Sequence, residues 1–290
     1  MRPALSAGSR KGRLSETLFV GALLLAVLIG VAALAALVIS VLSQGIPRLS
    51  IEFLTSLPSR FAEKAGARPA IFGTLWIISV CTLFSVPVGI GAAIYLEEFA
   101  KKGRLSTLID VNIANLAGVP SIIYGLLGLA LFVRMFAMGR SVLAGGLTLG
   151  LLVLPVIVIV GREALRAVPS SIREGALALG ATKWQTISRQ VLPVALPSFM
   201  TGVILAISRA IGETAPLIAM GALTYVTFVP KALGDRFTAL PIQIFNWTSR
   251  PQAEFLDTAA AGIVVLLVVL LTMNTAAVLL RHRFEKVPRS

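Results

Sequence analysis

Arg209 and Glu213 stand four residues apart in an otherwise apolar stretch, which places both side chains on one face of a helix. If that helix crosses a membrane, each charge costs about 2.5–3.5 kcal/mol at the bilayer centre, so the pair should face other helices or a water-filled path. A guanidinium offers planar, bidentate donors that suit an oxyanion. The pair is therefore either an anion site on a translocation path or a neutralised pair that fixes the register of the helix.

Small residues recur at every fourth position of the same stretch, on a face adjacent to the charged pair. The stripe consists of Ser198, Gly202, Ala206, Ala210 and Thr214. Small side chains allow the backbones of two membrane helices to approach closely. We therefore expect Gly202, Ala206 and Ala210 to pack this helix against a neighbour.

Residues 162–197 have the pattern of two short helices separated by Gly180. Each helix opens with a Ser/Thr-x-x-Glu/Gln sequence, which is the spacing of a capping box. Gly180 is well placed for the left-handed turn that ends the first helix, and Leu192-Pro193 is expected to end the second. From these residues alone, the stretch is either a connector at the membrane surface or a docking element for a partner. The capping pairs are Ser171 with Glu174 and Thr182 with Gln185.

The composition determines the environment in which these residues must work. Hydrophobic residues make up 57% of the 290 positions and charged residues only 13%, whereas a soluble domain carries about 25% charged residues. The chain is therefore predicted to be an all-α integral membrane protein. Its net charge of +13 does not indicate nucleic-acid binding, because Lys and Arg lie in short gaps between apolar runs. One His and one Cys provide neither a metal site nor an intrachain disulfide.

Six stretches are long enough to cross the hydrocarbon core, which takes about 20 apolar residues. Five of them are uncharged, and the sixth carries Arg209 and Glu213. The first stretch is too long for the apolar region of a signal peptide and is expected to remain as an anchored helix. The predicted spans cover 18–42, 70–96, 111–133, 141–161, about 198–222, and 258–280.

Orientation follows from the distribution of Lys and Arg, which favour the cytoplasmic side of membrane proteins. With the N-terminus inside, 16 of the 26 basic residues fall in inside segments and nine in outside segments. Both termini are therefore predicted to be cytoplasmic, as is the stretch 162–197. The chain then divides into a cytoplasmic tail (1–17), a first transmembrane helix (18–42), a five-helix transmembrane domain (70–281) and a second tail (282–290).

The cytoplasmic stretch resembles the EAA loop of ABC-importer permeases. Gly175 stands where that pattern has Ala, and Gln190 stands where it has Ile. The resemblance implies a six-helix, MetI-like permease whose loop docks in a groove of a separate ATPase subunit. Since the chain has no Gly-x-x-x-x-Gly-Lys-Ser/Thr sequence, ATP must be bound by that partner, and no catalytic residue or cofactor is expected here. The implied coupling residues are Glu174, Gly175, Ala176, Gly180, Leu192 and Pro193, and all of them except Gly175 match the pattern in type and spacing.

Three further segments, 112–125, 206–217 and 240–247, resemble the PstA family of permeases from phosphate importers. This resemblance extends from about residue 70 to the C-terminal helix. It implies a permease subunit of an ATP-driven inorganic phosphate importer in the prokaryotic cytoplasmic (inner) membrane. The implied partners are a second, PstC-like permease, two copies of a PstB-like ATPase, an extracytoplasmic PstS-like phosphate-binding protein, and membrane lipid. Arg209 and Glu213 would then lie on the substrate path.

The same sequence features allow other functions. An ABC permease for molybdate, sulfate or phosphonate would share the EAA loop. A secondary transporter or channel needs no ATPase and predicts no docking loop, although residues 174–193 have the pattern of one. A membrane enzyme is disfavoured because His282 is the one histidine and no Ser/His/Asp set can form around it.

Overall fold

The computed structural model describes residues 10–101, 103–222 and 225–285. These residues form helices and connecting loops, and their one bridge of β type pairs Ser141 with Arg236. The all-α class predicted from the sequence is confirmed. Parts of the predicted tails, 1–9 and 286–290, lie outside the described residues.

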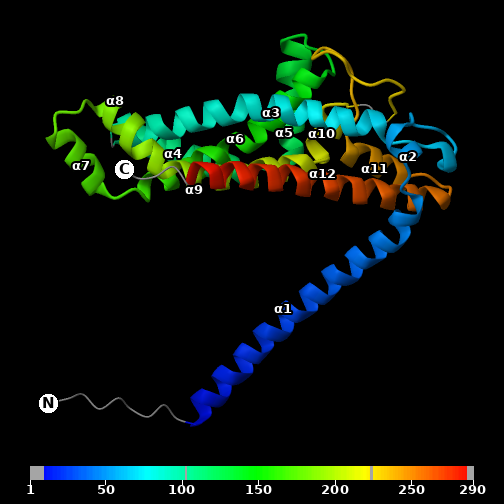
Figure 1. The fold of residues 1–290 in the computed structure, drawn as a ribbon, viewed down its shortest axis with the longest axis horizontal. Coiled ribbons are helices and arrows are strands. Elements are labelled where there is room, and N and C mark those ends of the chain that lie inside the picture. Colours follow the sequence, from blue (N-terminus) through cyan, green and yellow to red (C-terminus); the bar gives the residue numbers. More distant parts are fainter. Residues whose placement is uncertain (1–9, 102, 223–224, 286–290) are drawn as a thin grey trace.

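The first long helix, α1 (Arg10–Gly45), runs away from the rest of the chain as a single rod (Figure 1). Between Leu18 and Leu37 its side chains are apolar all round and exposed. A helix of that kind suits lipid or neighbouring membrane helices. It meets α12 (Glu254–Glu285) at its C-terminal end, where a Cβ on Gly45 would lie 2.7 Å from the carbonyl oxygen of Ala260.

Helix α6 (Val142–Arg166) lies in the middle of the bundle, in contact with α3 (Arg68–Ile94) and α9 (Leu192–Gly212). Glycine makes the close packing of α6 and α3 possible, because a Cβ on Gly146 would lie 2.4 Å from the Cβ of Val80. The core between these helices includes Ile77, Leu149 and Ile157, each 2% exposed or less. Helix α3 continues as one π-helical turn, η3 (Tyr95–Phe99).

The uncharged run at 111–133 forms a broken span, interrupted at Gly118 and Pro120, and is not one straight helix. It is divided between α4 (Arg104–Ala117) and α5 (Ser121–Gly128) with its π-helical extension η4 (Leu129–Met135), and the two parts are bent by 101°. Pro120 separates them because it lacks a backbone N–H and restricts the preceding residue. The Leu116 carbonyl has no i+4 donor at Pro120; it accepts from the Val119 N–H (3.1 Å) and from the Tyr124 hydroxyl (2.8 Å).

The end of the second short helix was predicted wrongly. Helix α8 (Lys183–Thr186) continues through the π-helical turn η5 (Ile187–Val191) into α9, so Leu192-Pro193 does not end it. Pro193 falls in the first turn of α9, where a missing N–H is tolerated, and the wider π turn precedes it. Helix α9 then stops at Gly212, short of the predicted end near 222.

Counting α4 with α5 and η4 as one broken span, the described residues contain six candidate membrane spans; five are unbroken helices. Helix α7 (Ser170–Ala178) and α8 lie at one end of the bundle (Figure 1). The opposite end holds α2 (Ile51–Thr55) and α11 (Leu240–Thr248), which pack around Phe53, Trp247 and Phe255. The remaining short elements are η1 (Ile46–Arg48), η2 (Ala62–Lys64) and α10 (Ala215–Ala219).

Candidate functional site

The N-cap residue of α7 is not Ser171, the residue that the sequence predicts. Pro169 is the N-cap residue, with φ −55° and ψ 139°, and the helix begins at Ser170. Ser171 therefore lies inside the first turn, where its hydroxyl is not in the capping position. The proline sets the entry of the chain into α7 by its restricted φ.

The connection from α7 to α8 has the geometry that the sequence predicts at its centre. Gly180 has φ +83°, a left-handed conformation that other residues adopt at a cost. The N–H of Gly180 donates to the carbonyl of Leu177 (2.9 Å), and the N–H of Ala181 donates to that of Ala176 (3.1 Å), which is a Schellman motif. Thr182 and Gln185 then form a complete capping box at the start of α8. The turn is thus defined by local hydrogen bonds.

Large apolar side chains are exposed on the outer surface of this loop, among charged and amide side chains. Leu179 is 91% exposed, and Leu177 and Trp184 are also exposed. A hollow of about 350 Å³ lies beside them, lined in part by Ala176, Gly180 and Arg189. Exposed apolar patches of this kind mark protein or membrane contacts. The other predicted loop positions lie as follows: Glu174, Gly175 and Pro193 are exposed, and Leu192 is half-buried.

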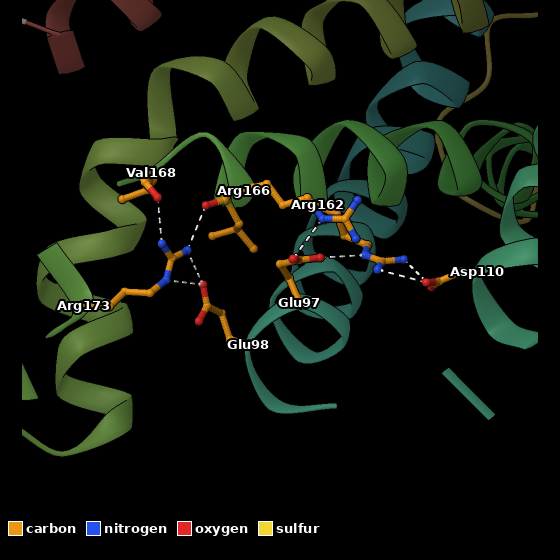
Figure 2. A network of polar contacts seen from close by, with 8 residues as sticks. Glu97, Glu98, Asp110, Arg162, Arg166, Val168 and Arg173 are labelled. Atoms are coloured by element: carbon orange, nitrogen blue, oxygen red, sulfur yellow. Dashed lines mark hydrogen bonds and ion pairs between the residues drawn. The ribbon is translucent and has the colours of Figure 1, made fainter. Parts of the chain in front are cut away.

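A network of ion pairs lies where η3, α4 and α6 meet, and Figure 2 shows it. Arg162 of α6 donates to Glu97 (Nε to Oε2, 3.1 Å) and to both carboxylate oxygens of Asp110 on α4. Arg166 donates from Nε to the other Glu97 oxygen at 2.9 Å. Bidentate pairs between Arg and carboxylates are strong and fix orientation, so the network holds the ends of α3, α4 and α6 together.

The same junction extends to α7 through Arg173 and Glu98, whose side chains are 24% and 9% exposed. Sequence reasoning missed Glu97, Glu98 and Asp110, and it counted the arginines only as topology signals. Their positions in the sequence could have indicated them, because Glu97 and Glu98 follow the uncharged run 70–96 and Asp110 precedes the run 111–133. Arginine neutralises each of these carboxylates, and no group of three or more His, Cys, Asp or Glu within the described residues is placed to hold a metal ion.

The structure brings Arg209 and Glu213 together. Nε of Arg209, in the last turn of α9, donates to Oε1 of Glu213 at 3.3 Å. Glu213 already has an extended backbone and ends the helix. The Arg209 side chain is 54% exposed and that of Glu213 18%, so the arginine is only partly covered by this chain. The site is therefore a cation at a helix break, open to whatever lies beside α9.

The small-residue stripe lies partly against α6. Gly202, Ala206 and Ala210 are buried, whereas Ser198 is exposed. A Cβ on Gly202 would lie 2.0 Å from Cγ1 of Val160 on α6, so the two backbones meet more closely there than an alanine allows.

A helical bundle with an exposed, glycine-pivoted loop at one end and charged residues at a helix break has the architecture of a membrane permease. The chain belongs to the family described as binding-protein-dependent transport system inner membrane components, whose profile matches residues 85–286. It is thus a multi-pass permease subunit of an ABC transporter.

Curated relatives cover most of the chain. It is 37% identical over 226 residues, 78% of this chain and 73% of the relative, to "Phosphate transport system permease protein PstA 1" of Mycobacterium tuberculosis. It is 31% identical to PstA of Haemophilus influenzae over 89% of this chain and 90% of that one. It is also 31% identical to "Probable ABC transporter permease protein YqgI" of Bacillus subtilis over 82% and 85%.

Solved structures agree on the fold. A bacterial ABC transporter involved in the import of alginate matches with a TM-score of 0.62 and 17% identity over 93% of this chain and 99% of that one. An inward-facing MetNI methionine ABC transporter matches with a TM-score of 0.60 and 18% identity over 74% and 94%. The MetI-like, six-span permease fold predicted from the sequence is confirmed.

Proposed function

We propose that this chain is the PstA-type permease subunit of an ATP-driven inorganic phosphate importer in a prokaryotic cytoplasmic membrane. The observation that carries the proposal is its identity of 31–37% to PstA proteins over most of its length. It forms the translocation path with a PstC-like permease. Two PstB-like ATPase subunits supply the energy, and a PstS-like binding protein delivers phosphate on the extracytoplasmic side.

The α7–α8 loop is the docking element for the ATPase. Its exposed leucines and Trp184 provide an apolar contact surface, and the left-handed Gly180 holds the two short helices at a fixed angle. In this arrangement Glu174, Gly175, Ala176 and Leu192-Pro193 take the positions of the EAA loop. Both termini then lie in the cytoplasm, and α2 and α11 lie on the extracytoplasmic side.

Arg209 is the anion-binding group of the path, with Glu213 beside it. A charge on a membrane helix requires water, a counter-ion or a partner helix, because exposure to lipid is costly. The Arg209 side chain is more than half exposed in this chain, and its guanidinium has more donors than the one bonded to Glu213, which leaves donors for a phosphate oxygen. Glu213 holds the guanidinium when the site is empty, and it can accept a proton from a protonated phosphate.

Uptake by the complete importer tests the proposal. The chain is reconstituted with the second permease, the ATPase and the binding protein in liposomes, and radioactive phosphate inside the liposomes is measured with and without ATP. We expect accumulation that requires ATP and every subunit, and that excess unlabelled phosphate abolishes but sulfate or molybdate does not. Competition by sulfate or molybdate would identify a permease for another oxyanion, and uptake without the ATPase would identify a secondary transporter.

A further inference from the structure

Two adjacent carboxylates on the π-helical turn η3 contact different parts of the chain. Glu97 pairs with Arg162 and Arg166 of α6, and Glu98 pairs with Arg173 of α7 (Figure 2). One turn at the end of α3 therefore contacts both a membrane helix and the short helix that precedes Gly180.

The Arg173 guanidinium donates hydrogen bonds from all three of its nitrogens to groups of this chain. Its Nε and Nη2 donate to Oε1 of Glu98 at 3.2 and 2.7 Å, and the same Nη2 donates to the carbonyl of Leu165 at 2.8 Å. Nη1 donates to the carbonyl of Val168 at 2.8 Å. These carbonyls lie at and just beyond the end of α6, where a helix has unsatisfied acceptors. The planar fork of arginine can make these contacts at once, whereas a lysine ammonium cannot hold the same geometry.

Apart from this polar contact, helix α7 packs mainly against the π-helical turn η5. None of the α7 residues is fully buried. Ile172 is half-buried and packs against the cluster that contains Leu165 and Phe199. Leu177 and the C-cap residue Leu179 are exposed. Arg173 therefore makes the polar attachment of α7 on its inner side, whereas the opposite side is open to a partner.

We propose that Glu98 and Arg173 form a clamp that makes α7 move as one body with the ends of α3 and α6. This inference rests on the proposed function, in which the ATPase displaces the α7–α8 loop. Through Glu98 the displacement reaches α3, and through Leu165 it reaches α6. The Glu97–Arg162–Asp110 contacts then carry it to α4. Arg173 and Glu98 are positioning residues, because they act through α7 and touch neither phosphate nor ATP.

The test measures phosphate imported per ATP hydrolysed by the reconstituted importer with Arg173→Gln, Glu98→Gln, both together, and Arg173→Lys. We expect each glutamine variant to keep its ATPase activity and to lower this ratio about tenfold, which corresponds to ~1.4 kcal/mol. The double variant should be no worse than the worse single one, since both remove the same contact. Arg173→Lys should retain an intermediate ratio. Matched controls are the exposed charges of α4 and α6, Arg104→Gln and Glu163→Gln, which should keep the wild-type ratio.

A second measurement does not depend on transport. Nitroxide labels at the exposed positions Thr107 of α4 and Ala178 of α7 report the distance between these helices in the full chain by pulsed electron resonance. We expect a narrow distance distribution in the wild type and a broader one in Arg173→Gln, including preparations that do not assemble with partners. An unchanged distribution, or an unchanged ratio in both glutamine variants, overturns the clamp. If the wild-type importer moves no phosphate, the proposed function fails, and the distance measurement still decides whether the clamp exists.

Discussion

Gly202 is buried where α9 crosses α6, and replacing it with alanine should drive the two helices apart. The added Cβ would lie 2.0 Å from Cγ1 and 2.8 Å from Cβ of Val160. Carbon atoms in contact are about 3.5–4.0 Å apart, so the closest approach is short by at least about 1.5 Å. A valine side chain in a helix is confined largely to one rotamer, and its Cβ moves only with the backbone. The clash is therefore relieved only by displacing α6 from α9.

The energetic cost follows from two opposing effects. Overpacking of a well-packed core destabilises by about 1–3 kcal/mol, and a clash that includes a Cβ belongs at the upper end. Alanine regains about 1 kcal/mol relative to glycine through its helix propensity. Gly202→Ala should therefore lower the free energy of unfolding by about 2 kcal/mol, a factor of roughly 30 in the ratio of folded to unfolded protein.

Gly212 provides the matched control on the same helix. A Cβ there would meet nothing within 4 Å, so Gly212→Ala should be neutral or slightly stabilising. Both variants are purified in detergent micelles, unfolded with sodium dodecyl sulfate, and followed by circular dichroism. Of the two variants, only Gly202→Ala should unfold at a lower midpoint concentration of sodium dodecyl sulfate than the wild type. Equal midpoints for the two variants would refute the close α6–α9 contact.

Three further predictions concern the loop and the topology. Gly180→Ala should destabilise the α7–α8 turn by about 1 kcal/mol because of its φ of +83°, and amide hydrogen exchange should speed up there but not in Gly175→Ala, whose added Cβ meets open space. Thr182→Ala removes the capping box and should cost about 1 kcal/mol, seen as faster exchange in the first turn of α8; unchanged exchange would argue against the cap. In intact cells, an impermeant maleimide should label Thr55→Cys and not Ser171→Cys, and the reverse pattern would invert the topology.

The apolar runs predict the location of the membrane helices well, because the cost of exposing charge to lipid leaves few alternatives. Within the run at 111–133, Gly118 and Pro120 indicate an interruption, but not whether the helix kinks or divides there. Pro120 can kink a membrane helix or divide it, and which of these occurs depends on the packing of the neighbouring helices. The hydrogen bond from the Tyr124 hydroxyl to the Leu116 carbonyl spans the break. It joins residues eight positions apart, so no local sequence pattern predicts it.

The sequence predicts part of the local structure of the loop. Gly180 and the Thr182 capping box depend on contacts within four residues, and the structure has both. Ser171 matches the capping pattern equally well, but Pro169 is the N-cap and the helix begins two residues earlier than that pattern predicts. The contacts of Glu98 with Arg173 and of Glu97 with Arg162 join residues 75 and 65 positions apart. Only the folded arrangement of α3, α6 and α7 brings them together.

The central claim is that Arg209 contacts the transported phosphate and does not only neutralise Glu213. The most direct measurement is ATP-dependent phosphate uptake by the reconstituted importer that carries Arg209→Gln together with Glu213→Gln, at an abundance matched to the wild type. The double change leaves no unpaired charge, so a structural pair predicts normal assembly and normal uptake. The account predicts normal assembly with uptake reduced at least about tenfold, since a hydrogen bond to a charged group contributes about 1.5–3 kcal/mol. Uptake near the wild-type level would contradict it and would place the anion path elsewhere.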